Sequence, residues 1–331
     1  MKLLRGLKSR RRLTVAVGSL ILLAFIAVNA IAFMQARAMT HFVASTSRTA
    51  PPERLSLVGK LKTILTGVRI PRPVNQSNPA DVGLRYQTVR FGCPHNDDLE
   101  GWFIPADSSR GFFIEFHAYS SSKSSLLLSA RALHDMGNNM GYDLLLVDFR
   151  GSGGSRGDQT TIGYDEANDV AGEVDYARKT WSPSELVLYG QSMGGAAILR
   201  AVAELNVRPS AIIIESTFDR LQSTVDNRFH AMGLPAFPFT SLLVFWGGWE
   251  QGYNGFAHNP ADYAAKVHCP ALVFQGGLDA RVTTPEARNL FNNLAGPKEF
   301  ELFENSKHCA FLGDDPKRWK DAIDSFLVRY Q

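Results

Sequence analysis

The chain of 331 residues is predicted to be an α/β protein, with a mostly parallel sheet covered by helices on both faces. Three observations predict this class. Short apolar runs recur along the chain, and segments with helical patterns separate them. The runs are continuously apolar, as is typical of parallel strands buried on both faces. Prolines also fall at the start of two expected helices, where the missing N–H costs nothing. The length suits one large domain with a full core.

The expected elements begin at residue 84. An antiparallel pair over 85–91 and 101–105 comes first, and alternation of strand and helix follows. The further strands are expected at 111–117, 142–148, 186–189, 211–215, 271–275 and 299–303, and the helices at 123–136, 164–181, 193–204, 284–294 and 315–330. Pro285 and Pro316 are the prolines at helix starts.

The N-terminus differs in composition from the rest of the chain. Six basic residues and no acidic ones occupy positions 1–12, and positions 13–36 carry no charge. Without those six charges the formal net charge of +3 becomes −3, so nothing indicates a surface for nucleic acid. The uncharged run is long enough to cross a hydrocarbon core of roughly 30 Å as a helix. Its positive flank is expected to stay in the cytoplasm, which places the following domain outside.

A single-pass membrane anchor at 13–36 is therefore expected, with the lipid bilayer as a partner. The alternative is a cleaved signal peptide and a secreted protein, since Ala36-Arg37-Ala38 supplies a small-x-small cleavage site. Residues 37–83 contain several prolines and are expected to form a tether with one short helix near 54–68, and residues 84–331 are expected to form the α/β domain.

Ser192 lies at the centre of the most informative stretch, Gly190-Gln-Ser-Met-Gly194. An apolar strand precedes it and a helix follows it, which is the context that a nucleophile elbow requires. The serine there has a strained backbone, and glycines two residues before and after it avoid collisions. The sequence therefore predicts that Ser192 is a nucleophile.

A serine nucleophile needs a base that an acid orients. His308 is the candidate base, in the loop between the last strand and the last helix. Asp279 is the candidate acid, in the turn after the preceding strand, and Glu215 is the alternative acid at the end of the strand before. The order serine, aspartate, histidine, each just after a strand, is the order of the triad in α/β-hydrolases.

On these residues the span 85–331 resembles the α/β-hydrolase superfamily, in particular its serine hydrolases with a serine-aminopeptidase-like pattern. Asp148-Phe-Arg-Gly-Ser-Gly-Gly-Ser-Arg-Gly157 resembles the family's loop after the fourth strand, and 259–270 resembles the segment that leads to the acid. The resemblance implies hydrolysis through an acyl-enzyme, without a cofactor or metal. It also implies an oxyanion hole made by the backbone N–H groups of Met193 and Tyr119. Many relatives have His-Gly where this chain has His117-Ala118.

The stretch 218–257 lies where this fold often has a lid, and a small helical cap is expected there. Its large apolar side chains are Phe229, Met232, Phe237, Phe239, Phe245, Trp246, Trp249 and Tyr253. We expect them to form the core of the cap and the wall of an acyl pocket. Cys93, Cys269 and Cys309 lack the spacing of a metal site and are expected to be structural.

The sequence thus predicts a membrane-anchored serine hydrolase that cleaves an ester, thioester or amide of an apolar or lipid-like acyl substrate. Two alternatives remain open. One is a catalytically silent binding module on the same fold, because function depends on the site and not on the fold. The other is a peptidase that acts on short peptides.

Overall fold

The protein is described by a computed structural model that covers residues 2–50, 55–93, 96–136, 141–309 and 311–330. A single sheet of eight strands forms its centre, in the order β1-β2-β4-β3-β5-β6-β7-β8. The strands are β1 (Gln87–Cys93), β2 (Asn96–Ile104), β3 (Phe112–Phe116), β4 (Asp143–Asp148), β5 (Leu186–Gln191), β6 (Ala211–Glu215), β7 (Ala271–Gly276) and β8 (Lys298–Phe303). Strand β2 is antiparallel to β1 and β4, and the other neighbours are parallel.

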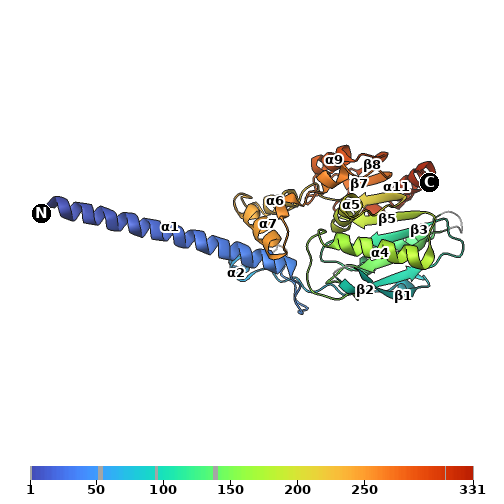
Figure 1. The fold of residues 1–331 in the computed structure, drawn as a ribbon, viewed down its shortest axis with the longest axis horizontal. Coiled ribbons are helices and arrows are strands. Elements are labelled where there is room, and N and C mark those ends of the chain that lie inside the picture. Colours follow the sequence, from blue (N-terminus) through green and yellow to red (C-terminus); the bar gives the residue numbers. More distant parts are fainter. Residues whose placement is uncertain (1, 51–54, 94–95, 137–140, 310, 331) are drawn as a thin grey trace.

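Helices cover both faces of this sheet (Figure 1). They are α1 (Lys2–Thr40), α2 (Leu57–Thr66), α3 (Leu127–His134), α4 (Glu166–Trp181), α5 (Met193–Glu204), α6 (Leu221–Ala231), α7 (Phe239–Glu250), α8 (Pro260–Ala264), α9 (Thr284–Asn293), α10 (Phe311–Asp314) and α11 (Pro316–Tyr330), with short 3-10 helices η2 (Pro79–Val82), η3 (Lys123–Leu126) and η4 (Gly255–Ala257). The predicted α/β class and strand order along the chain are confirmed. The helix expected at 123–136 begins as a 3-10 turn and ends two residues early.

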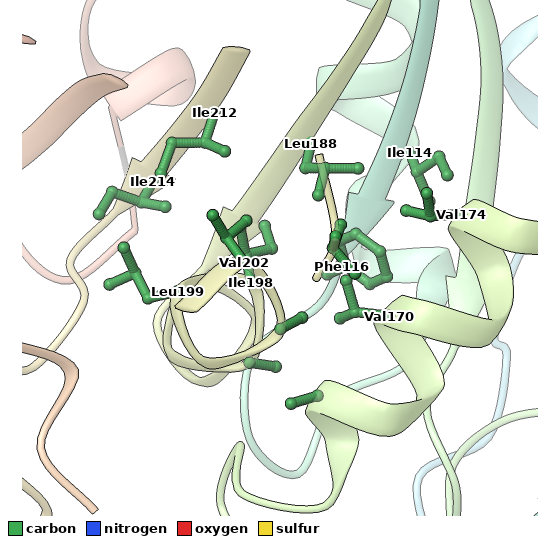
Figure 2. Packing of buried hydrophobic residues seen from close by; sticks show 14 of the residues in the cluster. Ile114, Phe116, Val170, Val174, Leu188, Ile198, Leu199, Val202, Ile212 and Ile214 are labelled. Atoms are coloured by element: carbon green, nitrogen blue, oxygen red, sulfur yellow. The ribbon is translucent and has the colours of Figure 1, made fainter. Parts of the chain in front are cut away.

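The core has one apolar layer on each face of the sheet. On one face, side chains of β3, β5 and β6 pack against α4 and α5, and Figure 2 shows Phe116, Leu188 and Ile214 meeting Val170 and Ile198 there. On the other face, alternate residues of the same strands pack against α3 and α11. Because both faces are covered, the central strands are apolar at most positions, which explains their nearly continuous runs; Glu115 on β3 and Glu215 at the end of β6 are the buried exceptions among the positions of these two strands.

Helix α1 extends away from this body (Figure 1). Its residues 11–27 are exposed. Among the helices that the structure describes, α1 alone is both long enough and apolar enough to cross a membrane. The C-terminal part of α1 packs against α7. There Asn29 Oδ1 accepts a hydrogen bond of 3.1 Å from Trp246 Nε1, and Arg37 forms an ion pair with Glu250. The segment expected to be an anchor is thus joined to the cap.

The segment between α1 and β1, expected to be a tether, lies along the body. The N–H of Phe42 donates to the carbonyl of Asp158 at 2.7 Å. The guanidinium of Arg72 donates to the carbonyls of Gly153 and Gly157, each at 2.9 Å. The short helix expected near 54–68 is α2. These contacts hold the segment against the loop that follows β4.

The stretch 218–257 is helical, as expected, and contains α6, α7 and η4. Its aromatic side chains do not form the closed core that the sequence suggested. Phe237 is 80% exposed and Trp249 is 64% exposed, and Phe239 and Phe245 are also exposed. The cap therefore presents an apolar surface outward, beside the point where α1 leaves the body.

Candidate active site

Ser192 lies between β5 and α5, with backbone angles φ 51° and ψ −106°. A positive φ is costly for a residue with a Cβ, so the surrounding structure must hold this turn in place. The N–H of Ser192 donates to the carbonyl of Glu215 at 2.7 Å, which ties the turn to the end of β6. The serine is partly exposed at the C-terminal edge of the sheet, where ligands bind in open α/β sheets.

The glycines on either side of Ser192 have the role that the sequence indicated. A Cβ on Gly190 would lie 2.6 Å from the backbone of Gly194, and a Cβ on Gly194 would lie 2.5 Å from the carbonyl oxygen of Phe116. The backbone of Gly194 is held in α5 and that of Phe116 in β3, so neither can move away without disrupting its element. The tight strand-to-helix turn therefore requires glycine at both positions.

His308 and Asp279 lie together, as the sequence predicted. The Nδ1 atom of His308 is 2.7 Å from Oδ2 of Asp279. The other carboxylate oxygen of Asp279 accepts hydrogen bonds from the N–H groups of Arg281 and Val282, at 2.8 and 3.0 Å. Burial raises the pKa of Asp279, but the histidine and these N–H groups outweigh it, so the pKa is lowered. The carboxylate is thus held ionised and aimed at the ring.

The end of β6 connects the serine to the histidine. Its carbonyl at Glu215 accepts from the N–H of Ser192, and Oγ of Ser216 accepts from the N–H of Cys309 at 3.2 Å. The two loops are therefore adjacent at the same edge. Within the described residues the Ser192 side chain makes no hydrogen bond. Catalytic hydrogen bonds often tighten only when substrate binds.

Glu215, the alternative acid, has hydrogen-bond partners other than His308. Its Oε1 accepts a hydrogen bond of 2.7 Å from Trp319 Nε1, and its Oε2 accepts one of 3.4 Å from Gln191. Burial raises the pKa of Glu215 to about 7. A second carboxyl, Glu115 on β3, is also fully buried, and its pKa is raised to about 8 by burial. These acids belong to the interior on the α11 side.

The two candidate oxyanion donors are Met193, which directly follows the serine, and Tyr119, in the loop after β3. Met193 is the first residue of α5, where backbone N–H groups lack partners within the helix. Tyr119 follows β3 in the loop whose first residues are His117 and Ala118. Ala118 has no positive φ, so the loop does not need glycine there. His117 is fully buried, and its Nε2 accepts from the N–H of Phe149 at 3.1 Å, which fixes this loop against the end of β4.

The sequence reasoning missed an ion cluster beneath the Asp148 loop. Lys123 is fully buried, and its Nζ contacts the carboxylates of Asp148 and Glu100. It also lies 4.4 Å from the ring centroid of Trp102. The N–H of Gly154 donates to Asp148 Oδ2 at 2.8 Å. The motif that resembles the family loop is therefore structural in this chain, and no sequence spacing pairs Lys123 with Asp148.

A narrow apolar cavity of about 50 Å³ lies between the end of α1, the cap and Tyr119. Met39, Val244 and Gly247 contribute to its wall, and Arg228 is the charged residue among those that line it. The hydroxyl of Tyr119 donates to the carbonyl of Met39 at 2.5 Å. The membrane-spanning candidate helix thus forms part of the wall beside a candidate oxyanion donor.

Cys269 and Cys309 are free thiols, and the side chain of Cys93 lies outside the described residues. Burial raises the pKa of both free thiols, which makes them poor nucleophiles. Among the described side chains, no group of three His, Cys, Asp or Glu could hold a metal ion.

Comparison with known proteins places this arrangement among hydrolases. Residues 129–331 match the model of the prolyl oligopeptidase family. The Escherichia coli K12 protein YfhR is 26% identical over 235 residues, which cover 69% of this chain and 75% of that protein. The Schizosaccharomyces pombe protein bem46 is 25% identical over 247 residues, covering 72% and 77%.

Solved structures share the fold. An esterase from Pyrococcus furiosus superposes with a TM-score of 0.67 at 24% identity, covering 78% of this chain and 97% of that one. An acylaminoacyl peptidase from Pyrococcus horikoshii has a TM-score of 0.56 at 15% identity, covering 75% of this chain and 42% of that one. Both likenesses concern the fold.

Proposed function

Because the chain belongs to the prolyl oligopeptidase family of α/β-hydrolase-fold serine hydrolases, we propose that Ser192, His308 and Asp279 form its catalytic triad. The contact of 2.7 Å between His308 Nδ1 and Asp279 Oδ2 carries the proposal. A carboxylate at Nδ1 keeps the proton on that nitrogen and leaves Nε2 free to accept the serine proton. The strained elbow holds Ser192 at the same edge of the sheet.

In the proposed reaction, Oγ of Ser192 attacks the substrate carbonyl while Nε2 of His308 takes the hydroxyl proton. The developing oxyanion is held by the N–H groups of Met193 and Tyr119, each worth roughly 3–4 kcal/mol in the transition state. His308 then protonates the leaving group, and an acyl-enzyme forms. Water, activated by His308, releases the acid and restores the serine.

We propose an apolar or lipid-like acyl group as substrate. The cavity beside Tyr119 supports this, because α1 and α7 supply an apolar wall through Met39 and Val244. Esters and thioesters are the bonds that such a chain most often carries.

We further propose that α1 remains attached and anchors the enzyme, with its basic end in the cytoplasm and the hydrolase outside. The contacts of Asn29, Ala36 and Arg37 with the cap and body support an uncleaved helix, since cleavage after Ala38 would remove all three. The positive cluster before the span supports the orientation.

Labelling with a fluorophosphonate probe tests the triad. Full-length protein in detergent is expected to label stoichiometrically, and Ser192→Ala is expected not to label while unfolding at the same temperature. A folded wild-type protein that fails to label would favour the alternative, a catalytically silent binding module.

A peptidase is the second candidate function, favoured by the family to which residues 129–331 belong. A panel of p-nitrophenyl esters of increasing chain length, set against aminoacyl p-nitroanilides, separates the two. The proposed acyl hydrolase is expected to prefer the esters, with kcat/KM rising with chain length. Preference for the anilides would assign the peptidase.

A further inference from the structure

Three arginines from distant parts of the sequence border the candidate active site. The backbone N–H of Arg281 donates to the triad carboxylate of Asp279, and Nη2 of Arg48 donates to Ser120 Oγ at 2.9 Å. The guanidinium carbon of Arg228, on α6, lies 5.6 Å from the ring centroid of Tyr119. The side chains of Arg48 and Arg228 therefore both contact the loop that contains Tyr119, the second candidate oxyanion donor.

Helix α6 is fixed against the turn that holds Arg281. The carbonyl of Arg281 accepts hydrogen bonds from Asn227 Nδ2 at 3.2 Å and from Thr224 Oγ1 at 3.4 Å. Asn227 directly precedes Arg228, so the position of Arg228 relative to Arg281 is set by packing. The pKa of Arg228 is lowered, chiefly by burial and also by the positive charges of Arg281 and Arg48.

No carboxylate among the described residues forms an ion pair with Arg48, Arg228 or Arg281. Arg150 offers a contrast within the same chain. Arg150 is partly buried, as Arg228 is, and its Nη2 and Nε donate to Asp169 at 2.6 and 3.1 Å. Arg48 and Arg281 are exposed, whereas Arg228 is partly buried. A partly buried guanidinium that has like charges nearby and no carboxylate partner is unfavourable. Such an arrangement is useful when a bound anion supplies the missing charge.

We propose that Arg228, with Arg48 and Arg281, binds a phosphate or carboxylate group of the acyl substrate, an inference that rests on the proposed hydrolase function. A guanidinium presents paired N–H donors that match the oxygens of either anion. Arg228 also lines the apolar cavity of about 50 Å³ beside Met39 and Val244, so a short acyl chain in that cavity would lie next to this guanidinium. The substrate class is therefore an acyl ester with an anionic head group.

Binding to the full-length Ser192→Ala protein tests this without requiring turnover. The probes are butyryl glycerol 3-phosphate and butyrylglycerol, which share an acyl chain and differ in the phosphate. Inorganic phosphate and succinate serve as competitors that separate a phosphate site from a carboxylate site. The phosphate-bearing probe is expected to bind at least roughly tenfold more tightly.

Arg228→Gln in this background is expected to bring the affinity ratio of the two probes close to one. The matched control is Arg220→Gln, since Arg220 is exposed at the start of the same helix and is expected to keep the ratio. If Arg228→Gln does not fold, the exposed Arg281 provides a second variant, Arg281→Gln, with a smaller fall in the ratio. Equal affinity for both probes in the parent, or an unchanged ratio in Arg228→Gln, would overturn the proposal. If the proposed hydrolase function is wrong and the anion site is right, the wild-type protein will bind the anionic probe but will not label with fluorophosphonate.

Discussion

At the scale of single residues, the roles of the two candidate acids can be separated. Asp279→Asn places an amide donor at Nδ1 of His308 and favours the wrong tautomer, so turnover of a p-nitrophenyl ester is expected to fall by roughly 10⁴-fold. Glu215→Gln keeps an acceptor for Trp319 and is expected to cost less than tenfold. Steady-state kinetics on both variants decide which carboxylate orients His308. A larger loss of turnover in Glu215→Gln would assign this role to Glu215 at the end of β6.

The pair of buried acids Glu115 and Glu215 makes stability depend on pH. Their pKa values are raised to about 8 and about 7, chiefly by burial, whereas an unfolded glutamate titrates near pH 4.3. Between these values the folded state binds more protons than the unfolded state, so their contribution to stability falls as pH rises. The loss is complete above about pH 8.

Glu115→Gln is therefore expected to raise the free energy of unfolding at pH 9 by on the order of 1–3 kcal/mol relative to wild type, and by less at pH 5. Oε2 of Glu115 accepts from Ser129 Oγ at 2.5 Å, and the amide oxygen can keep that bond. Thermal unfolding from pH 5 to 9 measures the difference. A constant difference across this range would show that the carboxyl does not titrate there.

Residue roles differed in how far the sequence could predict them. The elbow glycines and the Asp279–His308 contact followed from local patterns and chain order, because each residue directly follows its own strand. The contact of Lys123 with Asp148 and Glu100 did not, since it depends on β4 lying beside β2. Strand order across a sheet leaves no periodic signal in one sequence.

At the scale of elements, two adjacent glycines of α7 are expected to respond differently to substitution. A Cβ on Gly248 would lie 2.5 Å from the N of Gly255 and 2.6 Å from the carbonyl oxygen of Tyr253. Gly248→Ala is therefore expected to destabilise the cap by about 1–3 kcal/mol. A Cβ on Gly247 would lie 3.8 Å from the Cβ of Ala36, which is an ordinary van der Waals contact.

Gly247→Ala is the matched control and is expected to be neutral or to stabilise α7 by up to about 1 kcal/mol through helix propensity. Limited proteolysis of the cap and thermal unfolding measure both variants. Equal sensitivity of the two variants would contradict the close approach of η4 to α7.

The elements also differed in how well they could be predicted. Strands such as β6 were located because burial on both faces makes them continuously apolar. The cap helices were expected, but the outward direction of Phe237 and Trp249 was not. Aromatic content gives the same signal for a packed core and for an exposed apolar surface, and only the neighbouring elements distinguish them.

At the scale of the whole molecule, the candidate anchor helix α1 and the cap are packed against each other. The sequence predicted the helix and the cap separately. The hydrogen bond between them joins Asn29 and Trp246, which are 217 residues apart in the sequence. The exposed apolar part of α1, residues 13–27, extends about 22 Å at about 1.5 Å per residue. A hydrocarbon core of roughly 30 Å needs about 20 residues, so a span that begins after Arg12 ends near residue 32.

At that level α1 is packed against α7. The ring of Phe33 lies 5.6 Å from that of Trp246 and 6.4 Å from that of Trp249. If α1 spans the bilayer, these tryptophans lie at the outer membrane interface, where tryptophan is enriched in membrane proteins. The cavity that α1 and α7 line would then lie close to this interface.

Full-length protein in nanodiscs tests this with phosphatidylcholine brominated on its acyl chains, which quenches nearby tryptophan. Wild type is expected to be quenched, and the double variant Trp246→Phe, Trp249→Phe is expected to lose most of that quenching. Trp181→Phe is the control, since Trp181 packs on Phe103 in the body, with ring centroids 4.3 Å apart. Residues 2–50 contain no tryptophan, so α1 contributes no signal. Quenching that the double variant retains would place α7 outside the bilayer, and a mature protein that begins at Met39 in the soluble fraction would exclude the anchor itself.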